Sequence, residues 1–150
     1  MNRDIDMRIR KAGPSDREQL MVIWLEGSRA GHAFLGEERL RAQYPVVREN
    51  YLPNADNWLA VDDQQLLGFI GLIGSHVGGL FVIPHAHRRG VGRALIDHAA
   101  ARKGELGVEV YEANAGAVAF YRRCGFQLVG RKALDDEGRP FPLLRMRRPG

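Results

Sequence analysis

The stretch LFVIPHAHRRGVGRALIDHAAAR, residues 80–102, contains the pattern that decides the fold. Its first four residues are apolar and predict a buried strand, which ends at Pro84. A short basic loop follows, and after it the apolar residues Val91, Leu95 and Ala99 recur at helical spacing. The predicted order is therefore strand, basic glycine loop and helix.

This order makes the loop a candidate phosphate site. Backbone N–H groups at the start of a helix have no partner within the helix, and the helix dipole favours negative charge there. Glycines let the backbone approach an anion closely, and arginines add charge and forked hydrogen bonds. The residues expected to surround the anion are His87, Arg88, Arg89, Gly90, Val91, Gly92 and Arg93.

Two common phosphate-binding motifs do not fit the loop. A dinucleotide fingerprint needs a third glycine where this chain has Leu95. A P-loop ends in Gly-Lys followed by Ser or Thr, whereas residues 92–94 read Gly-Arg-Ala. The loop therefore indicates a different phosphate-containing ligand.

Histidine and cysteine positions do not predict a metal site or a disulfide. His85 and His87 lie in the loop, and His76 and His98 lie near it in sequence, but no third ligand follows at a standard metal-binding spacing. Cys124 is the single cysteine, so it cannot form a disulfide within the chain, and we expect it to be a small packed residue.

Length and composition favour one domain spanning residues 1–150, with 45% hydrophobic and 27% charged residues. No apolar run could span a bilayer and the first six residues do not resemble a signal peptide, so we expect a cytoplasmic protein with no membrane partner. The net charge of +4 permits an anionic partner. Helix-turn-helix, zinc-finger and RNP patterns are absent, so no specific nucleic-acid partner is expected.

Periodicity and turn residues predict a mixed α/β fold. The expected strands are 7–11, 58–61, 66–73, 80–83, 106–111, 127–134 and 141–148. The expected helices follow Ser15 and end near residues 27–31, cover 36–51 with an interruption at Pro45, and cover 90–102 and 115–123. Residues 62–64 are expected to form a turn, and 74–79 a loose, glycine-rich connection. An antiparallel meander with at least one parallel crossover follows from this order.

Two blocks of sequence together point to a family. The first is the strand, loop and helix start at residues 80–95, and the second contains Asn114, Ala117, Phe120-Tyr121 and Gly125-Phe126. At this separation the pair resembles the GNAT superfamily of acyl-CoA-dependent N-acetyltransferases, and residues 135–144 resemble its YjaB-type bacterial branch. The resemblance implies a GNAT-like α/β fold. Its mixed central sheet would have six to seven strands, splay at the fourth strand, and be flanked by about four helices.

The resemblance also implies acetyl-CoA as cosubstrate, with its pyrophosphate in the basic loop. The backbone of Phe81 and Val82 would pair with the pantetheine amides like an added strand. The glycines at 78 and 79 suit the bulge at which the strand splays. Asn114 would reach the pantetheine arm. His87 departs from the family motif, which has Gln or Arg at this position.

Tyr121 would lie near the thioester sulfur and act as the general acid. A phenol has a reference pKa of about 10, against about 8.5 for a thiol, so it remains protonated and can donate. The backbone N–H of Val82 would stabilise the developing oxyanion. The candidates for the general base are Glu109, Tyr111, His76, His32 and an ordered water.

The predicted function is transfer of an acetyl group from acetyl-CoA to an amine by direct attack. The acceptor would be a small molecule or a peptide, and the protein a monomer or a homodimer. Because the loop has a histidine at 87 and the base is undecided, a non-catalytic coenzyme A-binding module is the alternative.

Overall fold

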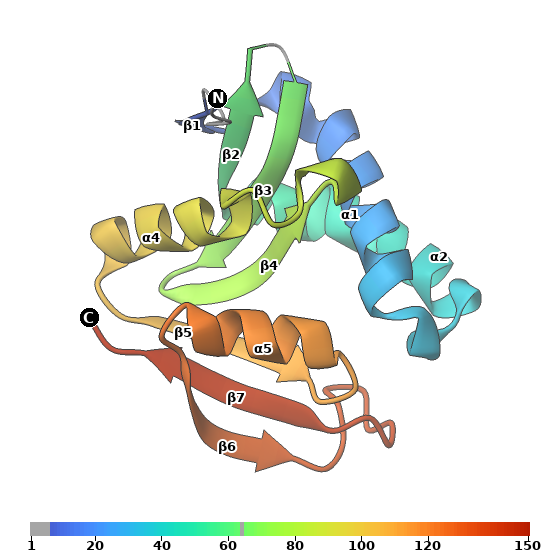
Figure 1. The fold of residues 1–150 in the computed structure, drawn as a ribbon. Coiled ribbons are helices and arrows are strands. Elements are labelled where there is room, and N and C mark those ends of the chain that lie inside the picture. The colour runs from blue at the N-terminus through green and yellow to red at the C-terminus, as the bar shows by residue number, and fades with distance from the viewer. Residues whose placement is uncertain (1–6, 64) are drawn as a thin grey trace.

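The computed structural model describes residues 7–63 and 65–150, which form a seven-stranded mixed sheet in the order β1-β2-β3-β4-β5-β7-β6 (Figure 1). The strands are β1 (Met7–Lys11), β2 (Asp56–Asp62), β3 (Gln65–Ile73), β4 (His76–Val82), β5 (Leu106–Tyr111), β6 (Gln127–Lys132) and β7 (Leu143–Arg148). Within the described residues β4 and β5 pair in parallel, and the other neighbouring strands are antiparallel. The predicted mixed α/β sheet is confirmed.

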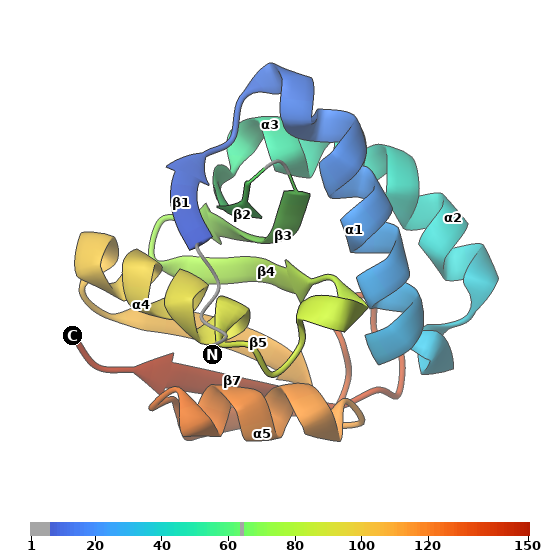
Figure 2. The same ribbon diagram turned by 45° about the horizontal axis from the view of Figure 1, so that its top comes forward.

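Helices cover both faces of this sheet (Figure 2). They are α1 (Arg17–Gly31), α2 (Glu37–Val46) with its continuation into α3 (Leu52–Asn54), α4 (Val91–Lys103) and α5 (Ala115–Arg123). One core cluster joins α1 and α2 to the sheet through Leu20, Leu40 and Phe69. The other joins α4 and α5 to the opposite face and includes Leu95 and Tyr121. No helix in the described part of the chain is both long and apolar enough to cross a membrane.

Several expected strand and helix ends differ from the observed ones by one or two residues, and two expectations differ by more. Residues 74–79 are not a loose connection, because β4 begins at His76 and pairs with β3 from there. Pro45 does not interrupt the helix, and a π-helical turn, Val47–Tyr51, follows it and carries the chain into α3. Residues 1–6 and residue 64 of the expected turn lie outside the described residues.

The fourth strand splays from the fifth, as expected. Their parallel pairing comprises His76 with Gly107 and Val77 with Val108. On the other side of β4 the register shifts, because Gly71 pairs with Gly79 and Leu72 with Val77. Residue 78 is thus the extra residue of a bulge, and beyond it β4 and β5 separate.

Tyr51, at the end of the π-helical turn, packs against this bulge. A Cβ atom at Gly78 would lie 2.7 Å from Cε1 of Tyr51 and would also collide with the hydroxyl oxygen. The hydroxyl is buried without a hydrogen-bond partner, and burial raises the pKa of Tyr51 to about 12. The close approach of this ring therefore requires glycine at position 78, a contact that the sequence did not indicate.

We predict that Gly78→Ala lowers the free energy of unfolding by about 1–3 kcal/mol, because the added methyl group must displace a packed ring. Denaturant unfolding measures the change. Gly107→Ala is the matched control on the neighbouring strand, since its Cβ would have no neighbour closer than 3.9 Å. Equal stability of the two variants would contradict the packing argument.

Candidate active site

A cavity of about 910 Å³ lies where β4 and β5 separate. Its walls come from α1, β4, the loop before α4, β5 and α5. All of the residues that the sequence selected for the site line this cavity except Arg89. The structure therefore brings together His76, Phe81, Val82, His87, Arg88, Gly90, Val91, Gly92, Arg93, Glu109, Asn114 and Tyr121.

The basic loop leads into the N-terminus of α4. Gly90 is the N-cap residue and has φ +82°, a left-handed conformation that favours glycine. Arg88 also has a positive φ, 64°, and its side chain lines the cavity. Arg93 Nη1 donates to the carbonyl of Arg123 at 3.0 Å, which ties the start of α4 to the end of α5. The cavity therefore has a cationic end suited to a phosphate.

His87 turns back onto β4. Its Nε2 lies 2.8 Å from the carbonyl oxygen of Val82. The residue that departs from the family motif thus holds the loop against the end of the splayed strand.

The hydrogen-bond register of β4 decides which backbone groups face the gap. Ile83 N–H donates to the carbonyl of Leu67 at 2.9 Å, and β3 and β4 are antiparallel. In an antiparallel ladder, hydrogen-bonded residue pairs alternate with non-hydrogen-bonded ones. The backbone of Phe81 therefore bonds to β3, whereas Leu80 and Val82 point their backbone groups toward β5. The carbonyl of Phe81 indeed faces β3. The backbone of Phe81 is therefore not available to a ligand, contrary to the sequence expectation.

Phe81 contributes its ring to the cavity wall instead. The ring packs on the α1 face of the sheet, with its centroid 5.5 Å from that of Phe69. Leu80 and Val82, on either side of Phe81, form the free edge of β4.

Asn114 is the N-cap residue of α5. Its Oδ1 accepts a hydrogen bond from the N–H of Ala117 at 3.2 Å. Its Nδ2 approaches α1, 2.9 Å from the position that a Cβ of Gly31 would take. Asn114 thus has a clear structural role in starting α5, and it also lines the cavity.

Tyr121 lies on the α5 side of the cavity and is 7% exposed. Its ring packs edge-on against Phe120 and Phe126, with centroid distances of 5.2 Å in both pairs. Burial raises the pKa of Tyr121, so the phenol keeps its proton at neutral pH.

The candidate bases occupy different parts of the cavity. Glu109 and Tyr111 share one face of β5, while Val108 and Val110 are buried on the other, as the alternation predicted. The carboxylate of Glu109 is paired with Lys132. His76 is exposed and lies at the closed end, where β4 and β5 are still paired.

His32 ends α1 and lines the cavity. Its ring is 5.3 Å from that of Tyr111 and 6.1 Å from that of Phe34, both edge-on. Burial, and next the nearby charge of Arg39, lowers the pKa of His32. The imidazole is therefore neutral at pH 7 and can accept a proton.

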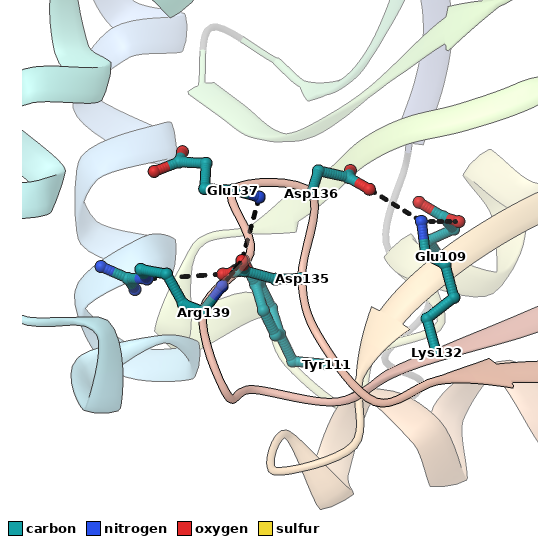
Figure 3. Close-up of polar contacts among 7 residues, drawn as sticks. All are labelled: Glu109, Tyr111, Lys132, Asp135, Asp136, Glu137 and Arg139. Atoms are coloured by element: carbon teal, nitrogen blue, oxygen red, sulfur yellow. Dashed lines mark hydrogen bonds and ion pairs between the residues drawn. The ribbon is translucent and has the colours of Figure 1, made fainter.

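The loop between β6 and β7 closes one side of the site, with Asp135 as its anchor (Figure 3). The buried carboxylate accepts the backbone N–H groups of Glu137 at 3.0 Å and Arg139 at 2.8 Å. The hydroxyl of Tyr111 donates to it at 3.4 Å. This anchor was not predicted from the sequence, although an aspartate at the start of a DDEG turn is a signal for such bonding.

In the described residues, no group of three or more histidine, cysteine, aspartate or glutamate side chains is arranged to hold a metal ion. Cys124 is buried and has no disulfide partner.

Similarity to known proteins agrees with this geometry. The family model of the acetyltransferase (GNAT) domain matches residues 53–128. Peptidyl-lysine N-acetyltransferase YjaB of Escherichia coli (strain K12) is 40% identical over 139 residues, which cover 92% of this chain and 94% of the relative. Peptidyl-lysine N-acetyltransferase YiaC of the same organism is 39% identical over 133 residues, covering 88% and 91%.

Solved structures show the same fold. The solution structure of the apo form of YjaB from Escherichia coli matches with a TM-score of 0.84 and 39% identity, covering 94% of this chain and 96% of that one. The PaiA N-acetyltransferase of Thermoplasma acidophilum, solved with coenzyme A, shares the fold with a TM-score of 0.78 at 20% identity, covering 97% and 100%. With the family model and these relatives in agreement, the chain belongs to the GNAT family of acetyl-CoA-dependent N-acetyltransferases.

Proposed function

We propose that this enzyme acetylates the side-chain amine of lysine in a peptide or protein. The observation that carries the proposal is the cavity in the β4–β5 splay. It has arginines at the loop end, a free strand edge along its length, and carboxylates on the side away from the loop. Relatives that cover most of this chain are named peptidyl-lysine N-acetyltransferases, which supports lysine as the acceptor.

The loop and the free edge of β4 would hold acetyl-CoA in one direction. A ligand whose pyrophosphate sits at the start of α4 must run back along β4 toward the bulge. It would meet Val82 first and Leu80 second, about 7 Å deeper at strand spacing. The arm would therefore accept a hydrogen bond from the N–H of Val82, whose carbonyl already contacts His87, and the N–H of Leu80 would donate to the developing oxyanion. This changes the role that the sequence analysis gave to Val82.

His32 is our choice for the group that removes the proton from the acceptor's ammonium. Its imidazole is neutral at pH 7, half-buried and in the cavity wall. Glu109 pairs with the ammonium of Lys132, which marks it as a group that holds a cation as a carboxylate and not as one that takes a proton. His76 lies at the closed end of the splay. These observations favour His32 over Glu109 and His76. Tyr111 is a poorer base because burial raises its pKa, so that its hydroxyl keeps its proton.

Tyr121 would complete the transfer as the general acid. The free amine attacks the thioester carbon, the carbon–nitrogen bond forms, and the carbon–sulfur bond breaks. The leaving thiolate then takes the phenolic proton of Tyr121, which burial keeps in place until that step. The nitrogen loses its second proton as the amide forms, and this proton restores the phenol of Tyr121, so one proton in all is released, by way of His32.

A panel of acceptors tests the function: short blocked peptides with one lysine each, lysine-free peptides with a free N-terminus, and polyamines. Release of free thiol from acetyl-CoA should require both the lysine and the enzyme, and mass spectrometry should find the acetyl group on the lysine side chain. Transfer to polyamines or peptide N-termini alone would contradict lysine as the acceptor.

We predict that His32→Gln lowers kcat by at least about a hundredfold, as expected for the loss of a general base. In the unchanged enzyme, kcat should fall in acid as the imidazole becomes protonated. The midpoint should lie below the usual histidine value of about 6.5, because the pKa of His32 is lowered. This acid limb should disappear in the variant.

His98→Gln is the matched control for this experiment. The pKa of His98 is also lowered, by burial and then by the charge of Arg102, but its ring packs at a tilt against Trp58, and His98 does not line the cavity. The pH–kcat profile of this variant should keep its acid limb. An unchanged profile in His32→Gln would exclude His32 as the base.

We also predict that Tyr121→Phe lowers kcat by about a hundredfold while the Kd for acetyl-CoA, measured by calorimetry, stays within about twofold. The ring packing is retained and only the proton donor is lost. Tyr44→Phe is the control, since Tyr44 packs on Trp24 outside the cavity. If Tyr121→Phe turns over as fast as this control, Tyr121 is not the acid.

A further inference from the structure

We propose that the ammonium group of Lys132 occupies the recognition site for the acceptor's own amine, which displaces it on binding. The proposal rests on the lysine-acetyltransferase function argued above and assigns specificity within its cavity. Lys132 would act as a resident competitor, and the carboxylates of Glu109 and Asp136 would recognise the incoming cation.

The geometry of this group is drawn in Figure 3. Lys132 is the last residue of β6, and its Nζ lies 3.2 Å from Oε2 of Glu109 and 2.7 Å from Oδ1 of Asp136. Both carboxylate residues line the cavity in the β4–β5 splay. Lys132 does not itself line the cavity, so its ammonium meets these two cavity-lining residues at the edge of the cavity in which the transfer would occur.

The position of Asp136 is fixed by the loop that carries it. The neighbouring Asp135 has a side chain only 1% exposed, is ion-paired with Arg139, and accepts hydrogen bonds from the backbone and from Tyr111. Glu137, on the other side, forms an ion pair with Arg39 of α2. Asp136 is thus presented to Glu109 by an anchored loop.

The charge distribution of the cavity favours this end for a cationic acceptor. Arg88, Arg93 and Arg123 line it near the loop and α5, where an ammonium would be repelled. The other acid that lines the cavity in the described chain is Glu26 of α1, which also lines a second hollow together with Pro84 and His85 of the loop. Glu109 and Asp136 remain as the carboxylates for the acceptor.

The two carboxylates also lie on the same side of the sheet as His32, the proposed base. Glu109 shares its face of β5 with Tyr111, and the ring of Tyr111 contacts that of His32. An amine held by the two carboxylates would thus lie on the same side of the sheet as the imidazole that takes its proton.

An ion pair exposed to this degree is weak and can be exchanged. The side chains of Lys132 and Asp136 are 40% and 71% exposed, and such pairs contribute little because water screens them. A lysine amine from the acceptor can replace Lys132 at low cost, since the two groups are chemically the same. Removing Lys132 should therefore strengthen acceptor binding by a modest factor.

The test compares Lys132→Met with the unchanged enzyme. With a blocked tripeptide that has one central lysine, KM for the peptide should fall by about two- to fivefold, and kcat and KM for acetyl-CoA should not change. Calorimetry with the same peptide and coenzyme A-loaded protein should find Kd lowered by a similar factor. Lys132→Arg retains a cation at this position and should not show the decrease in peptide KM.

Arg131→Met is the matched control. Arg131 is adjacent on β6 and pairs with Glu112, which does not line the cavity, so this variant loses an ion pair without opening the site. An unchanged or raised peptide KM in Lys132→Met, or the same decrease in Arg131→Met, would overturn the proposal. Failure of the unchanged enzyme to acetylate any lysine peptide would instead refute the proposed function, so the two failures are distinguishable.

Discussion

The parallel pairing of β4 with β5 stops after two residue pairs, and the candidate active site depends on that interruption. A sheet that stayed paired would use the backbone groups of Leu80 and Val82 internally. Because a bulge at residue 78 turns β4 away, those groups face a cavity instead. Tyr51 packs on the bulge from the α2 side, so the core supports the opening.

The two ends of the cavity carry opposite charges. The start of α4 and nearby arginines form the end suited to phosphate, and they come from one continuous stretch of sequence. The opposite, acidic side is assembled from β5, β6 and the β6–β7 loop, which Asp135 holds together (Figure 3). A cosubstrate and a cationic acceptor would thus approach the splay from regions of opposite charge.

Much of the fold could be predicted because its signals are local. The strand before the loop, the glycine at the start of α4, and helix α5 with its boundaries at Ala115 and Arg123 follow from apolar periodicity and turn residues. The start of β4 was misassigned because Gly78 and Gly79 look like a loop in sequence. In the structure a neighbouring strand and the ring of Tyr51 hold them in a bulged strand.

By itself, the sequence determined the family-like pattern, the glycine loop before α4 and part of the cavity lining, because each depends on residue type at short spacing. Only the tertiary structure decided that Leu80 and Val82, and not Phe81, face the gap, since hydrogen-bond register requires a partner strand. It also decided that His87 contacts β4, that His32 is neutral, and that Lys132 lies between Glu109 and Asp136. Burial and ion pairing arise between segments far apart in the chain, so no local pattern contains them.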